Sequence, residues 1–311
     1  MRRCTMLKKT LATLATAALL SSGMAVAEDR VSIGTGGTGG LFYVIGAGMA
    51  DVINRNLDGT TARAEVTGAS VENIRRVAAG QMTFGFSSSS TLYEATVGEG
   101  PFNGQPLEVA AMAYLYPAVL QVATVEGTGI TDLSQLAGKS VSMGPPGSNA
   151  AVLAQRLLTA YGVLDDVEQQ FLSYNEGISA LKNGQVEAAV VLAGAPTASL
   201  IDLDAQEDMV LLSVDADTVA GMIEDYPFYQ LYDVPADTYP DQTGPVTMIN
   251  DPATLFTAAN ADEDLIFNLT SALFDNLDQL SEVHPQAAAI SAGTATQVPI
   301  DLHPGAARYF E

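Results

Sequence analysis

The chain has 311 residues, enough for one large or two medium-sized domains with a buried core. Its 36 Asp and Glu outnumber its 13 Lys and Arg, and the net charge of −23 at pH 7 argues against nucleic acid and anionic membranes as partners. One cysteine and two histidines are too few for a disulfide framework or a metal centre rich in thiolate or histidine. We therefore expect no metal and no cofactor.

The first 27 residues have the pattern of a cleaved signal peptide. Four basic residues precede an uncharged apolar run over 11–20, and Ala25-Val26-Ala27 matches a small-residue cleavage site. The apolar run is too short to span a membrane. Cleavage after Ala27 removes four basic residues and no acid, which leaves 284 residues with a net charge of −27. The sequence thus predicts a secreted, periplasmic protein.

A glycine-rich loop over 34–40 follows a short apolar strand and precedes an amphipathic helix that runs to Leu57. Such a loop brings bare backbone N–H groups close to a ligand and points a helix N-terminus at it. The loop also matches G-x-G-x-x-G, which suggests a dinucleotide site. However, Asp58 precedes the next strand and Glu65 lies inside it, so neither is the acid that such a site needs. No lysine follows the glycines, which excludes a P-loop.

The remaining elements alternate between strand and helix for most of the chain. Glycines at 80, 162 and 184 are expected to end helices, and residues 201–245 are expected to be irregular with short helices. The predicted elements are a strand over 62–66, a helix from 70, a strand over 82–86, an apolar strand-like stretch over 110–125 broken by Pro117, a short helix over 131–136, a strand over 141–144, a helix ending before 162, a strand over 170–172, a helix over 176–183, a strand over 186–192, strands over 246–249 and 254–257, and a helix over 263–280.

The same unit occurs twice in the chain. Residues 31–34 (Val-Ser-Ile-Gly) are matched by 141–144 (Val-Ser-Met-Gly), and Gly80-Gln81-Met82 is matched by Gly184-Gln185-Val186. Each unit is strand–loop–helix–strand–helix–strand, which predicts a parallel α/β sheet. Ligands bind beyond the carboxyl ends of such strands. We therefore expect four small-residue loops to lie at ligand-binding edges, two in each lobe.

These loops supply the predicted binding residues. Helix N-termini near Gly40 and Ser148 point partial positive charge at one ligand, while hydroxyls and amides add hydrogen bonds. Each serine is also plausible as a local turn or cap residue. The predicted ligand-binding set is Gly37, Thr38, Gly39, Tyr43, Ser88, Ser89, Tyr116, Gly147, Ser148, Asn149, Ala193 and Gly194, with the two tyrosines covering the ligand.

The loops carry neither acid nor base, so an anion is expected to be held mainly by backbone N–H groups. Arg63, Arg75 and Arg76 are the candidates for one assisting cation, with a solvated face as the alternative. No catalytic residue is predicted, because residues 87–90 lack a G-x-S-x-G context and His284 and His303 lie in proline-flanked segments. A secreted hydrolase and a nicotinamide enzyme remain as alternatives.

Six stretches together are specific to one family. They are 33–40, 70–74, 136–141, 144–148, 193–196 and 302–309. With these stretches the mature chain resembles, over essentially its whole length, the TAXI solute-binding proteins of TRAP transporters. Two loops depart from the family pattern: residues 88–90 read Ser-Ser-Ser where the family often has Gln-Ser-Asp, and 147–150 read Gly-Ser-Asn-Ala where it often has Gly-Ser-Gly-Thr.

The resemblance implies an α/β, two-lobed type II periplasmic binding protein, each lobe a parallel or mixed sheet flanked by helices. After a signal peptide at 1–27, lobe 1 is expected at 28–116 with a C-terminal return over 258–311, and lobe 2 at 117–257. The crossovers are expected at 114–119 and 255–258.

The resemblance also implies the function. The expected protein is a monomeric, non-enzymatic receptor that closes on a small carboxylate or amino acid, similar to glutamate or 2-oxoglutarate. It is expected to deliver this ligand to an ion-gradient-driven TRAP permease. A sensor for a membrane signalling partner has the same fold and cleft, and it remains the alternative.

Overall fold

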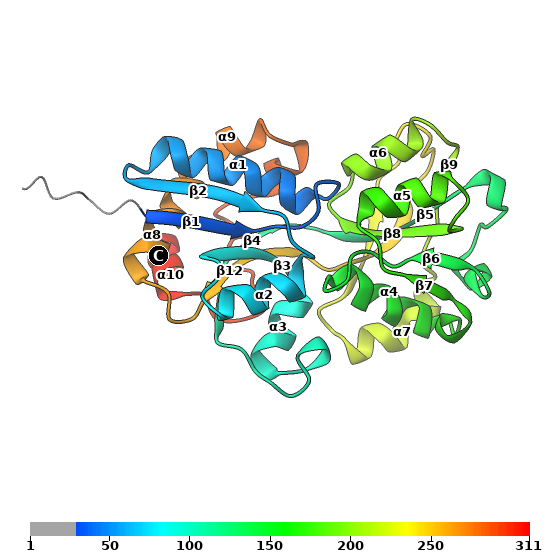
Figure 1. Cartoon of the computed structure of the whole chain (residues 1–311), viewed down its shortest axis with the longest axis horizontal. Coiled ribbons are helices and arrows are strands. Elements are labelled where there is room, and N and C mark those ends of the chain that lie inside the picture. The colour runs from blue at the N-terminus through cyan, green and yellow to red at the C-terminus, as the bar shows by residue number, and fades with distance from the viewer. Residues whose placement is uncertain (1–28) are drawn as a thin grey trace, which may run out of the picture.

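The computed structural model describes residues 29–311, which form two lobes side by side (Figure 1). The predicted signal peptide lies outside the described residues. None of the helices in 29–311 is long and apolar enough to cross a membrane. Each lobe has a mixed sheet with helices on both faces, as in the α/β two-lobed fold predicted from the sequence.

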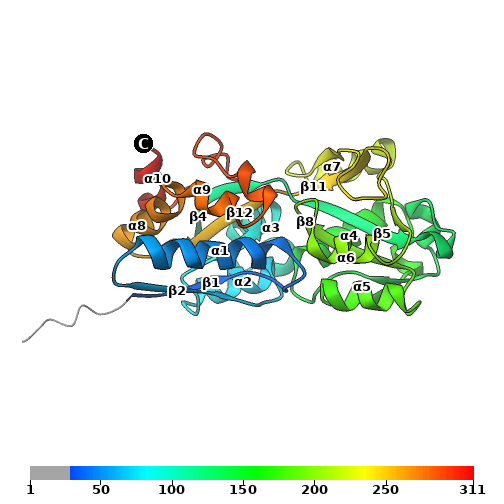
Figure 2. The same cartoon turned by 90° about the horizontal axis from the view of Figure 1, so that it is seen from above.

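The sheet of the first lobe has the order β2-β1-β3-β12-β4, in which β12 is antiparallel to both of its neighbours. One face packs against α1, α8, α9 and α10, and the other against α2 and α3 (Figures 1 and 2). The strands are β1 (Asp29–Gly34), β2 (Thr60–Glu65), β3 (Phe84–Ser88), β4 (Val109–Tyr116) and β12 (Ala253–Ala258), and the helices are α1 (Leu41–Asn56), α2 (Ser70–Ala78), α3 (Ser89–Val97), α8 (Glu263–Phe274), α9 (Leu277–Ser281) and α10 (Pro304–Phe310).

The sheet of the second lobe has the order β10-β11-β5-β8-β6-β7, and the short β9 also pairs with β5. Helices α5 and α6 pack on one face, and α4 and α7 on the other. The strands are β5 (Val119–Val125), β6 (Ser140–Ser142), β7 (Glu168–Gln170), β8 (Ala188–Ala193), β9 (Met209–Leu211), β10 (Gln230–Val234) and β11 (Val246–Asn250), and the helices are α4 (Asn149–Ala160), α5 (Tyr174–Lys182), α6 (Ala198–Asp204) and α7 (Ala216–Asp225).

The repeat found in the sequence is also present in the sheets. In the first lobe β1 lies between β2 and β3, and in the second β6 lies between β7 and β8, with all four pairings parallel. In both lobes an antiparallel strand then pairs with the third strand of the unit, β12 with β3 and β5 with β8. The loops that follow β1, β3, β6 and β8 therefore occupy matching positions in the two lobes.

The chain passes from the first lobe to the second at Pro117-Ala118, between β4 and β5, and returns at Asp251-Pro252, between β11 and β12. The predicted return over 255–258, with lobe 2 ending at 257, is therefore wrong. Strand β12 pairs with β3 and β4 over its whole length and belongs to the first sheet. Only two residues separate β11 from β12, and an apolar pattern cannot tell which sheet a strand joins.

Local sequence signals explain most helix ends. Gly80, Gly162 and Gly184 have φ of 69°, 69° and 65° just after α2, α4 and α5, the left-handed conformation that ends a helix. Ser173 starts α5 with a capping box that includes Glu176. The helix predicted over 263–280 is in fact two helices, α8 and α9, separated at Asp275-Asn276.

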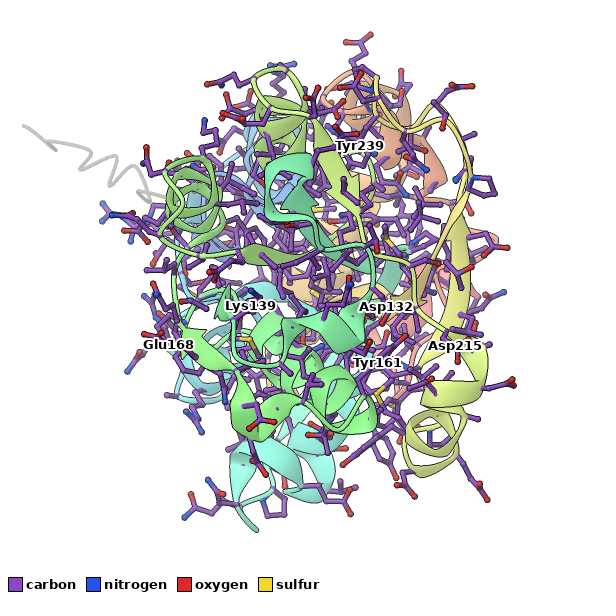
Figure 3. All side chains as sticks on the ribbon, turned by 90° about the vertical axis from the view of Figure 1, so that its right-hand side faces the viewer. Asp132, Lys139, Tyr161, Glu168, Asp215 and Tyr239 are labelled. Carbon is purple, nitrogen blue, oxygen red and sulfur yellow. The ribbon has the colours of Figure 1, made fainter. Side chains whose placement is uncertain are left out.

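Strands β9 and β10 and helix α7 lie within the stretch predicted to be irregular. In Figure 3, which faces the second lobe, Tyr161 at the end of α4 lies beside Asp215, the N-cap of α7. The backbone N–H of Asp215 donates to the Tyr161 hydroxyl at 2.7 Å, which ties the two helices together.

Candidate functional site

A small cavity of about 30 Å³ lies between the lobes, where the loops after β1, β3 and β6 meet. The volume is enough for about two water molecules. None of its lining side chains carries a formal charge. The lining residues are Gly36, Gly37, Gly40, Leu41, Phe42, Ala69, Ser70 and Ser88 from the first lobe, and Pro145, Ser148, Asn149, Ala150, Tyr174 and Leu192 from the second.

The N-cap residues of four helices line this cavity. They are Gly40 of α1, Ala69 of α2, Ser88 of α3 and Ser148 of α4. The first three make no side-chain capping hydrogen bond, whereas the Ser148 hydroxyl accepts from the N–H of Ala151 at 3.3 Å. Helix N-termini carry partial positive charge and free N–H donors. The cavity therefore has helix N-termini but no basic side chain around it, and first-turn N–H groups of α2 and α3 are already bonded to Gly147, Pro252 and Asp251.

Asn73 and Thr35 hold the glycine loop in place. The Asn73 amide nitrogen donates to the carbonyl of Thr35 at 2.7 Å and to that of Phe86 at 2.9 Å, so α2 joins the glycine loop to β3. Thr35 also bonds the Glu65 carbonyl through its N–H at 3.1 Å and its hydroxyl at 2.6 Å. These bonds fix the strand ends that present the loop to the cavity.

The two lobes touch around the cavity through backbone and side-chain hydrogen bonds. The Glu72 N–H, in the first turn of α2, donates to the Gly147 carbonyl at 3.2 Å. The Asn175 amide donates to the Thr38 hydroxyl at 3.3 Å. The structure is therefore a closed arrangement of the lobes.

Glycines allow this close approach. A Cβ on Gly68 would lie 2.5 Å from the carbonyl oxygen of Pro146 in the other lobe, and one on Gly40 would lie 3.2 Å from the Tyr174 ring. A Cβ on Gly39 would collide with the Asn175 side chain. The absence of side chains at these positions is what lets the loops of the two lobes meet.

A second contact between the lobes centres on Arg156 of α4. Its guanidinium forms an ion pair of 2.5 Å with Glu94 of α3, and both side chains are largely buried. It also donates to the Tyr229 hydroxyl at 2.5 Å and lies 4.0 Å from the centre of the Tyr226 ring. Burial raises the pKa of Glu94, and Arg156 opposes that rise only in part. This ion pair is an interlobe bond that water hardly reaches.

Asp251 lies between the lobes at the return connection. Its carboxylate accepts from the Ser90 N–H at 3.0 Å, from the Ser90 hydroxyl and from the Asn149 amide at 2.6 Å. Burial raises the pKa of Asp251 to about 6, while the hydrogen bonds from Ser90 and Asn149 lower it and the nearby Glu94 raises it further. One carboxylate thus joins α3 of the first lobe to α4 of the second.

The structure brings four of the predicted binding residues to the cavity: Gly37, Ser88, Ser148 and Asn149. Thr38, Gly39 and Gly147 lie at the contact between the lobes rather than on the cavity. Gly194 lies there too, since a Cβ on it would meet Leu41 at 2.7 Å. That these residues bind a ligand remains a prediction.

Four other predicted residues do not line the cavity. Ser89 bonds Thr254 at 2.9 Å, and Ala193 pairs with Val119 within the second sheet. Tyr43 is half-buried on α1. Tyr116 is fully buried, and its hydroxyl has no hydrogen-bond partner within the described residues.

Of the three arginine candidates, Arg63 and Arg76 pair with Glu65, while Arg75 donates to the Pro101 carbonyl at 2.8 Å. None of the three lines the cavity.

Several cavity residues and the buried Asp251 were not predicted from the sequence. Phe42 lines the cavity in place of its neighbour Tyr43, because the rotation of α1 about its axis is set by packing. Tyr174 was detectable only as the first residue after the capping Ser173. For Asp251 the one available signal was the Asp-Pro pair between two strand-like runs.

Both histidines serve as helix N-caps. His303 Nδ1 accepts from the Gly305 N–H at 3.2 Å, and His284 Nδ1 accepts from the Gln286 N–H at 3.1 Å. Among residues 29–311, no group of three or more His, Cys, Asp or Glu side chains is placed to hold a metal ion.

Several solved structures have a similar fold. PhnD1 from Prochlorococcus marinus, in complex with methylphosphonate, aligns with a TM-score of 0.55 and 9% identity over 85% of this chain and 92% of its own. A putative L-cystine ABC transporter protein from Listeria monocytogenes aligns with a TM-score of 0.53 and 13% identity, over 87% and 99%. The alkanesulfonate-binding protein SsuA from Xanthomonas axonopodis pv. citri, bound to MOPS, aligns with a TM-score of 0.51 and 13% identity, over 86% and 85%.

The fold is therefore that of two-lobed periplasmic substrate-binding proteins, as predicted. A family model, described as the NMT1-like family, matches residues 33–311, which is nearly all of the described chain. The protein belongs to the NMT1-like family.

Proposed function

We propose that the protein is a periplasmic solute receptor that captures a small carboxylate or amino acid between its lobes and passes it to a membrane permease. The observation that carries the proposal is the convergence of four helix N-caps on one interlobe cavity. Helix α1 has no side-chain cap, and we propose that its first-turn N–H groups hold the anion, since Ser89 and Ser90 of α3 and Glu72 of α2 already donate to Pro252, Asp251 and Gly147. Such donors suit a carboxylate, a phosphate or a sulfate alike, and the resemblance to the TAXI proteins favours the carboxylate.

Capture requires the lobes to separate. The cavity of about 30 Å³ is smaller than any amino acid, so a ligand enters by opening and is then enclosed. The moving units would be the first sheet with its helices, including β12 onwards, and the second sheet from β5 to β11. A ligand that touches both lobes favours the closed arrangement because it binds that state more tightly.

Delivery to a TRAP permease is the finer part of the proposal. It is supported by the six TAXI-like stretches, three of which, 33–40, 70–74 and 144–148, contribute residues to the cavity. Uptake of labelled ligand by cells that express the candidate permease, energised by an imposed sodium gradient, tests it. Uptake that needs ATP instead of the gradient points to an ABC-type partner, and binding without any uptake points to the sensor alternative.

A thermal-shift screen tests the capture of a carboxylate. The panel contains small mono- and dicarboxylates, amino acids, sugars and metal cations, and a true ligand raises the melting temperature by mass action. We expect at least one carboxylate or amino acid to stabilise the protein. Stabilisation by sugars or cations alone would refute the proposal.

A further inference from the structure

Asn149, the first residue of α4, is held by one end of its amide only. It lines the cavity and is 1% exposed. Its Nδ2 donates to Asp251 Oδ2 at 2.6 Å and to the Ser90 hydroxyl at 3.3 Å. Its Oδ1 is buried and has no hydrogen-bond partner among the described residues. Buried acceptors nearly always have a hydrogen-bond partner in native proteins, so we expect a donor to bind this oxygen.

Asp251 determines which end of the amide is left over. An ionised carboxylate only accepts hydrogen bonds, so it binds the NH₂ group of Asn149 and rejects the oxygen. Asp251 is itself held by the N–H and the hydroxyl of Ser90 and is 0% exposed, which keeps it in place. Neither Asp251 nor Ser90 lines the cavity. The amide nitrogen is therefore turned to the protein interior, and the oxygen is the end that remains for the cavity.

We propose that Asn149, oriented by Asp251, is a specificity-determining residue that accepts a hydrogen bond from the ligand, so that the ligand carries an N–H or O–H donor beside its carboxylate. The proposal rests on the proposed function, because it places the ligand in the interlobe cavity. An α-amino acid or a 2-hydroxy acid meets the requirement. The 2-oxo acid of the same carbon skeleton offers only an acceptor at that position and leaves Oδ1 unpaired.

Matched sets of ligands test the inference on the full mature chain. Dissociation constants are measured by calorimetry for the amino, hydroxy and oxo acids of several skeletons, such as glutamate, 2-hydroxyglutarate and 2-oxoglutarate, or alanine, lactate and pyruvate. For the best-binding skeleton, the better of the amino and hydroxy acids is expected to bind at least about tenfold more tightly than the oxo acid, because a site built to pair a donor rejects an analogue that lacks it. Equal binding, or preference for the oxo acid, overturns the inference but leaves the proposed function intact.

Two variants then test the residues. Asn149→Ala is expected to remove the preference, because it removes the acceptor. Asp251→Asn is isosteric, and its new NH₂ group can donate to Asn149 Oδ1, which turns the Asn149 NH₂ group towards the cavity. The ligand preference of the Asp251→Asn variant is expected to shift towards the oxo acid by about tenfold or more. Gln155→Ala, on the same helix but off the cavity, is the control and keeps the wild-type preference.

The outcomes distinguish a failure of the role assigned to Asn149 from a failure of the proposed function. A wild-type preference that survives in both Asn149→Ala and Asp251→Asn overturns the role of Asn149, even where the ligand is an amino acid. If Asn149→Ala fails to fold, Asp251→Asn tests the role of Asn149 alone: a preference shifted towards the oxo acid supports that role, and an unchanged preference overturns it. If only carboxylates outside these sets bind, the inference is overturned and the proposed function stands; if only sugars or cations bind, both are refuted.

Discussion

Replacing Gly68 with alanine is expected to hold the lobes apart. Gly68 lies just before α2, and its added Cβ would be 2.5 Å from the Pro146 carbonyl oxygen of the second lobe. The obstacle is backbone, which cannot rotate away as a flexible side chain does. Glu72 Oε2, at 3.0 Å, is the far end of a flexible side chain and can move. The substitution therefore acts on the closed arrangement and leaves each lobe largely unaffected.

The size of the effect follows from the distances. An ordinary contact of a Cβ begins near 3.4 Å, so the two backbones must separate by about 0.9 Å at this point. The adjacent hydrogen bond from the Glu72 N–H to the Gly147 carbonyl, already 3.2 Å long, would be broken by that movement. Overpacking of this kind costs about 1–3 kcal/mol. Because the cost falls on the closed state, ligand affinity should drop by about 5- to 150-fold.

Calorimetric titration with the best ligand of the screen measures the loss, and small-angle X-ray scattering measures the separation of the lobes. We expect Gly68→Ala to bind more weakly and, at saturating ligand, to keep a larger radius of gyration than the wild type. The melting temperature without ligand should hold or rise slightly, since alanine reduces the freedom of the unfolded chain. Gly127→Ala is the control, because a Cβ there meets nothing within 4 Å.

Unchanged affinity and an unchanged scattering curve would refute this reasoning, because they would mean that Gly68 and Pro146 do not meet in the ligand-bound state. A loss of unfolding free energy without ligand that equals the loss of binding free energy would also refute it, because it would show damage within a lobe.

Substitutions at three further places between the lobes, the Arg156–Glu94 pair, Asp251 and Ser148, give three more predictions. Arg156→Met leaves Glu94 buried without its partner and should lower the free energy of unfolding by about 3 kcal/mol. Adding Glu94→Gln should recover part of the loss. Strictly additive losses in denaturant titrations would contradict a bond between Arg156 and Glu94. Because the pKa of Asp251 is raised from 3.8 to about 6, the protonated form favours the folded state, and this contribution disappears as the pH rises through 6. Relative to Asp251→Asn, the wild type should therefore lose about 3 kcal/mol of unfolding free energy between about pH 4 and about pH 7. Glu94 and Tyr229, the neighbouring titratable groups, are present in both proteins. Parallel pH profiles of the two proteins would disprove the raised pKa of Asp251. Ser148→Asn and Ser148→Asp both keep an N-cap on α4, so the melting temperatures of both should stay close to that of the wild type. Only the aspartate places a negative charge on the cavity, and it should abolish binding of an anion. Equal binding by the two variants would exclude an anionic ligand at this site.

Local patterns in the sequence predicted two repeated α/β units, and the resemblance to the TAXI proteins added the two-lobed arrangement. The repeated strand–loop–helix unit at 31–34 and 141–144 predicted matching loops, and β1 and β6 do lie at equivalent places in their sheets. Glycine after a strand and serine before a helix are short-range signals, because they report the conformation of the residue itself. Gly37 and Ser148 were accordingly predicted for the site, and both line the cavity.

The remaining features depend on contacts between distant residues. Tyr116 was expected to cover a ligand, but on the edge strand β4 its side chain is fully buried, since strand pairing sets which side of a strand meets solvent. Asp251 contacts Ser90 and Asn149, which are 161 and 102 residues away in the chain. No local pattern distinguishes such an acid from the many on the surface, because its burial exists only once both lobes are assembled.

The place of β12 has a consequence for how the chain folds during synthesis. Every strand of the second sheet lies between Val119 and Asn250, so that sheet can form from one continuous stretch. The first sheet cannot, because within residues 29–311 β12 is the only strand that pairs with β4, and it also joins β4 to β3. Until residue 258 has left the ribosome, β4 has exposed edges and no partner. The N-terminal lobe, although synthesised first, is therefore the last to complete its sheet.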